Sequence, residues 1–244
     1  MTSHKPPIPT EPGEPPAETS NDNEVAEFLA KMKAMAPAPG ARGERGRLIF
    51  AMDATMSRQP AWDRALHIQA EMFAETARVG GLDVQLVYFR GFGECRASKW
   101  VSDPTALARL MTQVQCRGGN TQIGKVLAHI RKEASQRKIN AVVYVGDCME
   151  ENIDQLCARA GEIAILGVPI FMFQDGREPF AEQGFREIAR LTRGVYCRFD
   201  QGSARQLREL LSAVAVYAAG GRQALAELSR GKGGEATLLL EQLK

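Results

Sequence analysis

One apolar run, followed by three evenly spaced oxygen-bearing side chains, constrains this chain more than any other feature. Residues 48–52 (LIFAM) are all apolar and end abruptly at Asp53. A continuous apolar run of this length is typical of a parallel strand that is buried on both faces. Asp53, Thr55 and Ser57 then follow at alternate positions, and ligands of open α/β sheets bind beyond the carboxyl ends of the strands. The pattern predicts a hard-oxygen site, suited to a cation such as Mg²⁺, at the end of this strand.

Strand and helix patterns alternate along most of the chain. The segment at 94–101 is more mixed in polarity than the others and follows the turn Gly91-Phe92-Gly93, so we expect it to be an antiparallel edge strand. The alternation predicts an α/β fold with a doubly wound, mostly parallel sheet, one antiparallel edge strand and helices on both faces. The predicted strands lie at 48–53, 82–89, 94–101, 141–145, 168–173 and 194–199.

Composition divides the chain into three parts. Residues 1–45 hold eight of the twelve prolines, mixed with Glu, Ser and Thr, which predicts a disordered tail with one short amphipathic helix at 23–35. Residues 46–220 form the predicted α/β domain. Residues 221–244 are predicted to be a C-terminal tail or docking helix.

Charge, hydropathy and cysteine content argue against several classes of protein. The net charge is only +2, with acids and bases interspersed, so we expect no nucleic-acid partner. The sequence contains neither a long apolar run nor a secretory signal pattern, so we expect no membrane association. The five cysteines lack C-x-x-C spacing, which argues against disulfides or a zinc cluster and favours a cytoplasmic location.

Two features downstream complete the pattern that begins at Asp53. Thr121 lies in a glycine-rich loop (117–124) that leads into a helix, and Asp147 follows the apolar strand at 141–145. The order D-A-T-M-S, G-G-N-T, V-V-Y-V-G-D, with spacings of 68 and 26 residues, covers most of the folded body. It resembles the metal-ion-dependent adhesion site of von Willebrand factor type A (VWA) domains, which have a Rossmann-like fold.

The resemblance implies a role for each of these residues. Thr55 and Ser57 would bind Mg²⁺ or Mn²⁺ directly, and Asp53, Thr121 and Asp147 would bind it directly or through water. The under-neutralised cation would then accept an Asp or Glu carboxylate from a protein partner, with no catalysis. Intracellular bacterial members of this family commonly serve assembly, chaperone-like or stress-response complexes, some of which include ATPases.

The sequence departs from the family pattern at two places. Thr55 replaces a serine and keeps the hydroxyl, so ligation is expected to persist. Cys148 replaces the usual glycine after Asp147, and a soft thiol is a poor ligand for Mg²⁺. The acidic pair Glu150 and Glu151 is expected to face solvent at a helix start.

The same residues have three alternative interpretations besides a metal-dependent adhesion site. A phosphohydrolase of the haloacid dehalogenase type also has an aspartate at the end of its first strand, but Thr55 stands where its acid/base carboxylate is needed. Residues 119–125 (GNTQIGK) match the start of a phosphate-binding loop, but Val126 replaces the required Ser or Thr. A VWA fold with a degenerate, metal-free site is the third alternative.

Overall fold

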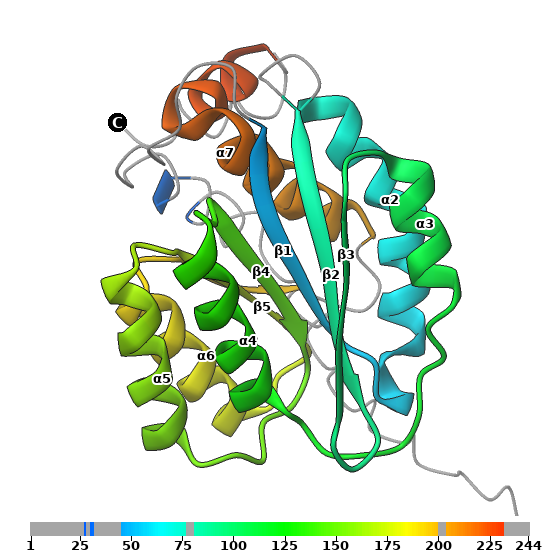
Figure 1. Ribbon diagram of the computed structural model, residues 1–244, viewed down its shortest axis with the longest axis vertical. Helices are drawn as coiled ribbons and strands as arrows, with labels where there is room; N and C mark the ends of the chain where they lie inside the picture. Colours follow the sequence, from blue (N-terminus) through cyan, green and yellow to red (C-terminus); the bar gives the residue numbers. More distant parts are fainter. Residues whose placement is uncertain (1–26, 28–29, 32–44, 77–80, 200–203, 232–244) are drawn as a thin grey trace, which may run out of the picture.

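The computed structural model describes residues 27, 30–31, 45–76, 81–199 and 204–231. Within these residues one six-stranded sheet has the order β3-β2-β1-β4-β5-β6, with helices on both of its faces (Figure 1). Strands β2 and β3 pair antiparallel, and all other neighbours pair parallel. This arrangement confirms the predicted fold class. The strands are β1 (Gly46–Asp53), β2 (Leu82–Arg90), β3 (Glu94–Val101), β4 (Ala141–Gly146), β5 (Ile170–Asp175) and β6 (Tyr196–Phe199).

The helices form two layers around the sheet. Helices α2, α3 and α7 cover one face, and α4, α5 and α6 cover the other. The helical elements are η1 (Met56–Arg58), α2 (Gln59–Thr76), α3 (Pro104–Thr112), α4 (Ile123–Gln136), α5 (Ile153–Ile165), α6 (Pro179–Leu191) and α7 (Ala204–Gly231).

Strand β1 is central because its side chains enter both hydrophobic cores. Leu48, Phe50 and Met52 pack into the core beneath α2, α3 and α7. Ile49 and Ala51 pack into the core beneath α4, α5 and α6. Each of these side chains is almost completely buried, which explains why the sequence shows a continuous apolar run instead of an alternating pattern.

Three of the helices on the sheet begin with a side-chain cap from the residue that precedes them. Asp103, Asn152 and Glu178 accept backbone N–H groups from the first turns of α3, α5 and α6, respectively. Helix α4 differs, because its N-cap residue, Gln122, makes no side-chain cap hydrogen bond. The first turn of α4 therefore needs hydrogen-bond acceptors from elsewhere in the chain.

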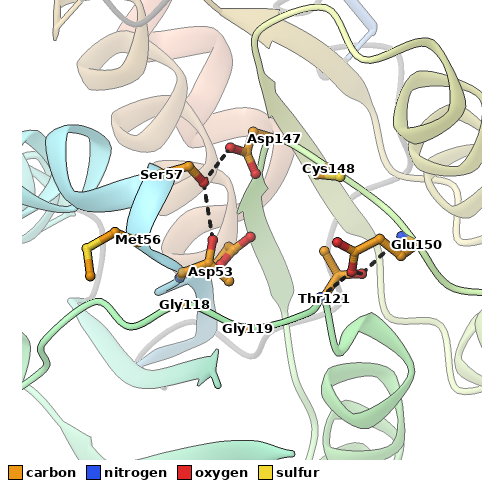
Figure 2. A pocket seen from close by; sticks show the side chains of 10 residues that line it. Asp53, Met56, Ser57, Gly118, Gly119, Thr121, Asp147, Cys148 and Glu150 are labelled. Carbon is orange, nitrogen blue, oxygen red and sulfur yellow. Dashed lines mark hydrogen bonds between the residues drawn. The ribbon is translucent and has the colours of Figure 1, made fainter. Parts of the chain in front are cut away.

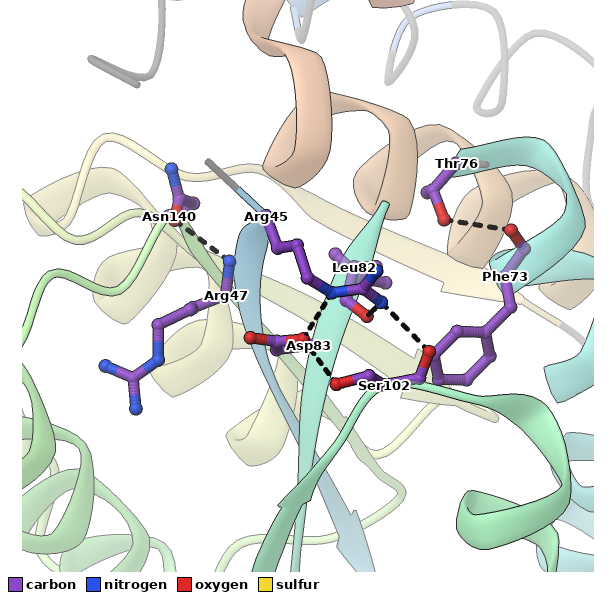
Figure 3. A network of polar contacts seen from close by, with 8 residues as sticks. All are labelled: Arg45, Arg47, Phe73, Thr76, Leu82, Asp83, Ser102 and Asn140. Atoms are coloured by element: carbon purple, nitrogen blue, oxygen red, sulfur yellow. Dashed lines mark hydrogen bonds and ion pairs between the residues drawn. The ribbon is translucent and has the colours of Figure 1, made fainter. Parts of the chain in front are cut away.

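A polar network ties the strands together at the end of the sheet where β1 begins (Figure 3). The Arg45 guanidinium donates to Asp83 and to the backbone carbonyls of Leu82 and Ser102. The Ser102 hydroxyl also donates to Asp83. These contacts join Arg45, which lies just before β1, to strand β2 and to the end of β3. The candidate site lies at the opposite end of the sheet.

The two ends of the chain lie largely outside the described residues. The predicted tail at 1–45 and its helix at 23–35 fall there, apart from a few isolated positions, and so does the segment at 232–244. Helix α7 continues past the predicted boundary at 220, with a break at Gly221, where φ is 69°. Among the helices that are described, none is long and apolar enough to cross a membrane.

The contact between β1 and α7 leads to a stability prediction. A Cβ atom at Gly46 would lie 2.2 Å from the carbonyl oxygen of Ala218 in α7, so Gly46→Ala must push two backbones apart. We expect this substitution to lower the free energy of unfolding by about 2 kcal/mol or more, measured by urea denaturation.

The matched control is Gly161→Ala in α5. A Cβ atom there meets nothing within 4 Å, and Gly161 lies inside a helix. Alanine is favoured over glycine at such positions, so we expect Gly161→Ala to stabilise the protein by roughly 0.5–1 kcal/mol. Equal stabilities of the two variants would contradict the close packing of β1 against α7.

Candidate metal centre

The predicted site residues meet at the carboxyl ends of the parallel strands. Asp53 is the last residue of β1, Asp147 follows β4 directly, and these two strands are neighbours in the sheet. Figure 2 shows Asp53, Ser57 and Asp147 grouped at this edge, with Thr121 on the facing loop. A pocket of about 260 Å³ lies between them, lined by Asp53, Thr55, Met56, Ser57, Gly118, Gly119, Thr121, Asp147, Cys148 and Glu150.

Oxygen atoms from the Asp53–Ser57 loop and from Asp147 are closely spaced. The hydroxyl oxygens of Thr55 and Ser57 lie 3.3 Å apart, and Ser57 Oγ donates to Asp147 Oδ2 at 2.9 Å. Adjacent ligands of an octahedral Mg²⁺ with bonds of 2.0–2.1 Å are separated by about 2.9 Å. The spacing of these oxygens therefore fits a small hard cation.

Asp53 has one oxygen in use and one without a partner. Its Oδ1 accepts the backbone N–H of Thr55 at 2.7 Å. Its Oδ2 is buried and has no hydrogen-bond partner within the described part of the chain. Burial raises the pKa of Asp53 from 3.8 to about 6, and the charge of Asp147 adds to this effect. Hydrogen bonds from Thr55 and the charge of Arg58 act in the opposite direction. A buried carboxylate oxygen without a donor is a suitable ligand for a cation.

Thr121 lines the pocket, but its hydroxyl is already bonded to Glu150. The Thr121 backbone N–H and hydroxyl both donate to Glu150 Oε2, at 2.8 and 3.2 Å. The Glu150 backbone N–H donates to the Thr121 hydroxyl at 3.1 Å in return. Figure 2 shows this pair to one side of the Ser57–Asp147 hydrogen bond. The structure therefore brings four of the five predicted residues into one group, with Thr121 beside it and held by Glu150.

Glu151 supplies the cap that helix α4 lacks. Its carboxylate accepts the backbone N–H groups of Ile123 and Gly124 in the first turn of α4. At the same helix start, Arg159 of α5 donates to the carbonyl of Gly124. A carboxylate at a helix N-terminus is favoured by both hydrogen bonding and the helix dipole. The expectation that this pair faces solvent holds for Glu150, whose side chain is exposed, whereas Glu151 is half-buried. Both also make contacts that were not expected, Glu150 with the Thr121 loop and Glu151 with the helix that follows it.

An ion pair lies buried beneath the pocket. Arg58, which follows Ser57, is completely buried, and its Nη1 lies 2.6 Å from Asp175 Oδ2 at the end of β5. The same nitrogen lies 3.8 Å from Asp147 Oδ2, and Arg64 Nη2 lies 3.8 Å from Asp175 Oδ2. Arg58 does not belong to the pocket lining. Arg58 therefore pairs with Asp175 and lies near Asp147 from outside the pocket, and its guanidinium does not fill the pocket.

The pocket has a mixed donor set. Among the described residues, no three His, Cys, Asp or Glu side chains come together in a way that could hold a metal by themselves. A cation in this pocket would depend on the hydroxyls of Thr55 and Ser57 in addition to Asp53 and Asp147. Neutral hydroxyls and carboxylates are the hard oxygen ligands that Mg²⁺ and Mn²⁺ accept.

Comparisons with solved structures place this arrangement among known folds. A von Willebrand factor type A protein from Catenulispora acidiphila matches 71% of this chain with a TM-score of 0.57 at 17% identity. The SpRpn10 VWA domain matches 70% of it with a TM-score of 0.53 at 13% identity. The chain has a VWA-like fold. The matched region spans 43% of the Catenulispora protein and 95% of the SpRpn10 domain.

A third similar structure is a pilus adhesin. SpaC from Lactobacillus rhamnosus GG matches 76% of this chain with a TM-score of 0.56 at 9% identity, over 30% of its own length. At the level of sequence, no family model matches this VWA-like chain, and no curated protein matches it either. The similarity therefore establishes the fold alone.

Cys148 places a soft thiol among the hard oxygen atoms of the pocket. Its half-buried thiol lines the pocket. Burial raises the pKa of Cys148, and the nearby charges of Glu150 and Asp147 raise it further. The thiol therefore stays protonated at neutral pH, and a protonated thiol is both a weak nucleophile and a weak ligand.

Sequence reasoning missed two contacts, that of Glu151 with helix α4 and that of Arg58 with Asp175. Only the first of them has a signal in the sequence. Asn152 already caps α5, so the two glutamates that precede it are not needed for that helix. The pair Arg58 and Asp175 had no comparable signal. The strand pattern predicts an end near Phe173, but β5 continues to Asp175 and carries this carboxylate to the edge of the sheet.

The buried ion pair leads to a prediction about stability. Asp175→Asn removes the nearest counter-charge of the buried Arg58 guanidinium and leaves Asp147 at 3.8 Å, so we expect a loss of roughly 3–5 kcal/mol in the free energy of unfolding. The control is Glu162→Gln, which removes the exposed partner of Arg131 from an equally short ion pair, 2.7 Å long. That variant is expected to lose no more than about 1 kcal/mol. Similar losses for both would contradict the importance of burial.

The raised pKa of Asp53 leads to a prediction about pH. Ionising Asp53 is harder in the folded state than in the unfolded state, so its contribution to stability falls as the pH rises from about 4 to 6. A rise from 3.8 to about 6 corresponds to roughly 3 kcal/mol. In the presence of chelator, Asp53→Asn should therefore gain stability relative to wild type by up to about this amount between pH 4 and 7. Urea denaturation across this range tests it, and a pH-independent difference would contradict the burial of the carboxyl group.

Proposed function

We propose that this chain is a divalent-cation-dependent protein-interaction module. In this proposal the pocket binds Mg²⁺ or Mn²⁺, and the cation accepts an Asp or Glu carboxylate from a partner protein. The main support is the convergence of Asp53, Thr55, Ser57, Thr121 and Asp147 on one pocket, with Asp53 Oδ2 buried and without a hydrogen-bond partner among the described residues.

The charges around the pocket support a role in binding carboxylates. Asp53 and Asp147 supply negative charge, and the Arg58 guanidinium, 3.8 Å from Asp147 Oδ2, offsets part of it. Thr55 and Ser57 contribute neutral hydroxyls. A bound divalent cation would balance these two carboxylates, and a carboxylate from outside the chain would be a further hard oxygen ligand at any coordination position that the chain leaves open.

Thr121 has a different role from the other four residues in this proposal. Its hydroxyl both donates to and accepts from Glu150, so it acts together with that residue. In this arrangement Thr121 would bind a cation through water, and its loop would close one side of the pocket. Direct ligation by Thr121 would use the second lone pair of its hydroxyl oxygen, because the Glu150 backbone N–H occupies only one.

The cellular setting of the module stays a prediction. A cytoplasmic location, a bacterial source, a role in stress response and a partner in an assembly complex or an ATPase are all expected from the family resemblance described above. One of the similar structures is a pilus adhesin, and this likeness supports adhesion to another protein as the general mode of action.

Metal binding is tested directly by titration calorimetry. The full-length chain, first treated with chelator, is titrated with Mg²⁺ and with Mn²⁺. Asp53→Asn and Asp147→Asn each remove a charged ligand, so we expect each to weaken binding by at least about tenfold. The control is Asp63→Asn, since Asp63 is an exposed carboxylate on α2 that pairs with Gln59. This variant should bind the cations like wild type.

Two outcomes would contradict the proposal. Failure of the wild-type chain to bind either cation would favour a VWA-like fold with a degenerate, metal-free site. Cation-dependent hydrolysis of a generic phosphomonoester that is lost in Asp53→Asn would favour a phosphohydrolase. Cation binding without hydrolysis is the result that we expect.

A further inference from the structure

The turn between β2 and β3 presents a large apolar side chain to solvent beside the pocket. Phe92 is 89% exposed. It stands between Gly91 and Gly93, whose φ angles of 60° and 133° are in the region that glycine adopts readily. Figure 1 shows this turn at the same end of the sheet as the start of α4. A single exposed apolar residue is common on protein surfaces, so its importance depends on how the turn is held.

Hydrogen bonds fix this turn against the loop that lines the pocket. The carbonyl of Gly91 accepts the backbone N–H of Asn120 and the side-chain amide of Gln122. Lys125 Nζ donates to the carbonyl of Gly93 at 2.7 Å. The backbones are also in close contact, because a Cβ atom at Gly119 would lie 2.2 Å from Gly91 O. The backbone on both sides of Phe92 is therefore held against the loop that lines the pocket.

A second exposed apolar side chain lies on the pocket lining. Met56 is 63% exposed, and Figure 2 shows it on the side of Asp53 away from Thr121. An unbranched thioether side chain adapts easily to the shape of a partner. Phe92 and Met56 thus offer two apolar contact points close to the proposed cation.

Cations surround the turn that carries Phe92. Glu94 accepts two hydrogen bonds from Arg90 and lies 3.6 Å from Arg96. Hydrogen bonding from Arg90 is the main cause that lowers the pKa of Glu94, and the charges of Arg96 and Arg117 lower it further. Three of the cations near the turn have exposed side chains: Arg96, Arg117 and Lys125. The surface around Phe92 is therefore positively charged and complements an acidic partner.

We propose that Phe92 and Met56, together with Arg96 and Arg117, form a docking surface for an acidic peptide segment of a partner protein. In this segment a large apolar side chain lies next to the carboxylate that reaches the cation. The apolar side chain packs on Phe92, Met56 offers a second apolar contact, and further carboxylates of the segment pair with Arg96 and Arg117. This inference rests on the proposed function, because the carboxylates lining the empty pocket would repel an acidic segment.

The experiment selects peptides from a random phage-displayed library on the full-length chain in Mg²⁺, with elution by chelator. We expect the recovered peptides to be rich in Asp and Glu, with Leu, Ile, Met, Phe or Trp next to an acidic residue. Binding of the recovered peptides is then measured on two variants of the docking surface and on one control variant. Phe92→Ser and the double variant Arg96→Glu with Arg117→Glu are each expected to weaken binding about tenfold or more.

The matched control is Ile165→Ser. Ile165 is 86% exposed at the end of α5, so this variant also removes a large exposed apolar side chain. It is expected to bind the peptides as wild type does. All variants are titrated with Mg²⁺ first, and unchanged Mg²⁺ affinity in Phe92→Ser separates docking from cation binding.

The outcomes distinguish failure of the docking surface from failure of the proposed function. The docking surface is wrong if no peptide is recovered, if the recovered peptides lack an apolar neighbour, or if Phe92→Ser binds them normally. Intact Mg²⁺ binding in any of these cases would leave the cation site standing. A wild-type chain that shows no Mg²⁺ binding and yields no chelator-eluted peptide would instead overturn both proposals.

Discussion

A buried ion pair holds the loop after β1 in place. Arg58 directly follows Ser57, and its guanidinium is fixed to Asp175 at the end of β5. Removing two charges from water costs several kcal/mol for each ion, and only close geometry offsets this cost. Because Arg58 is anchored in this way, the backbone that presents Thr55 and Ser57 after β1 is fixed relative to the ends of β5 and β4. The same guanidinium lies close enough to Asp147 to reduce the repulsion among the carboxylates of an empty pocket.

The opposite wall of the pocket is fixed by two consecutive glutamates. Glu150 binds Thr121, and Glu151 binds the first turn of α4, so the loop before α4 is tied to the loop after β4. Asp147 belongs to that same β4–α5 loop. Thr121 and Asp147 are therefore positioned together, and a shift of one loop would carry the other with it. The turn that bears Phe92 joins this unit through Asn120 and Gln122.

Sequence reasoning succeeded where local patterns determine the outcome and failed where distant segments meet. The apolar run ending at Asp53 predicted the central strand, because a strand buried on both faces needs apolar residues throughout. Asp53 and Asp147 were expected at one edge of the sheet because parallel strands end there, and the family resemblance added Thr121. In the structure all three line one pocket. The partners of Arg58 and Glu151 depend instead on tertiary packing. A buried arginine and a cap supplied by another loop look like ordinary surface residues in the sequence, so local rules could not identify them.

The cap on α4 also affects the order in which the chain can fold. Ile123 and Glu151 are separated by 28 residues, so the first turn of α4 is completed only after β4 and the following loop are present. Without Glu151 the backbone N–H groups of this first turn lose their side-chain acceptor, and uncapped helix ends fray. A chain cut before Glu150 would lose this cap together with the hydrogen bonds that hold Thr121 at the pocket wall.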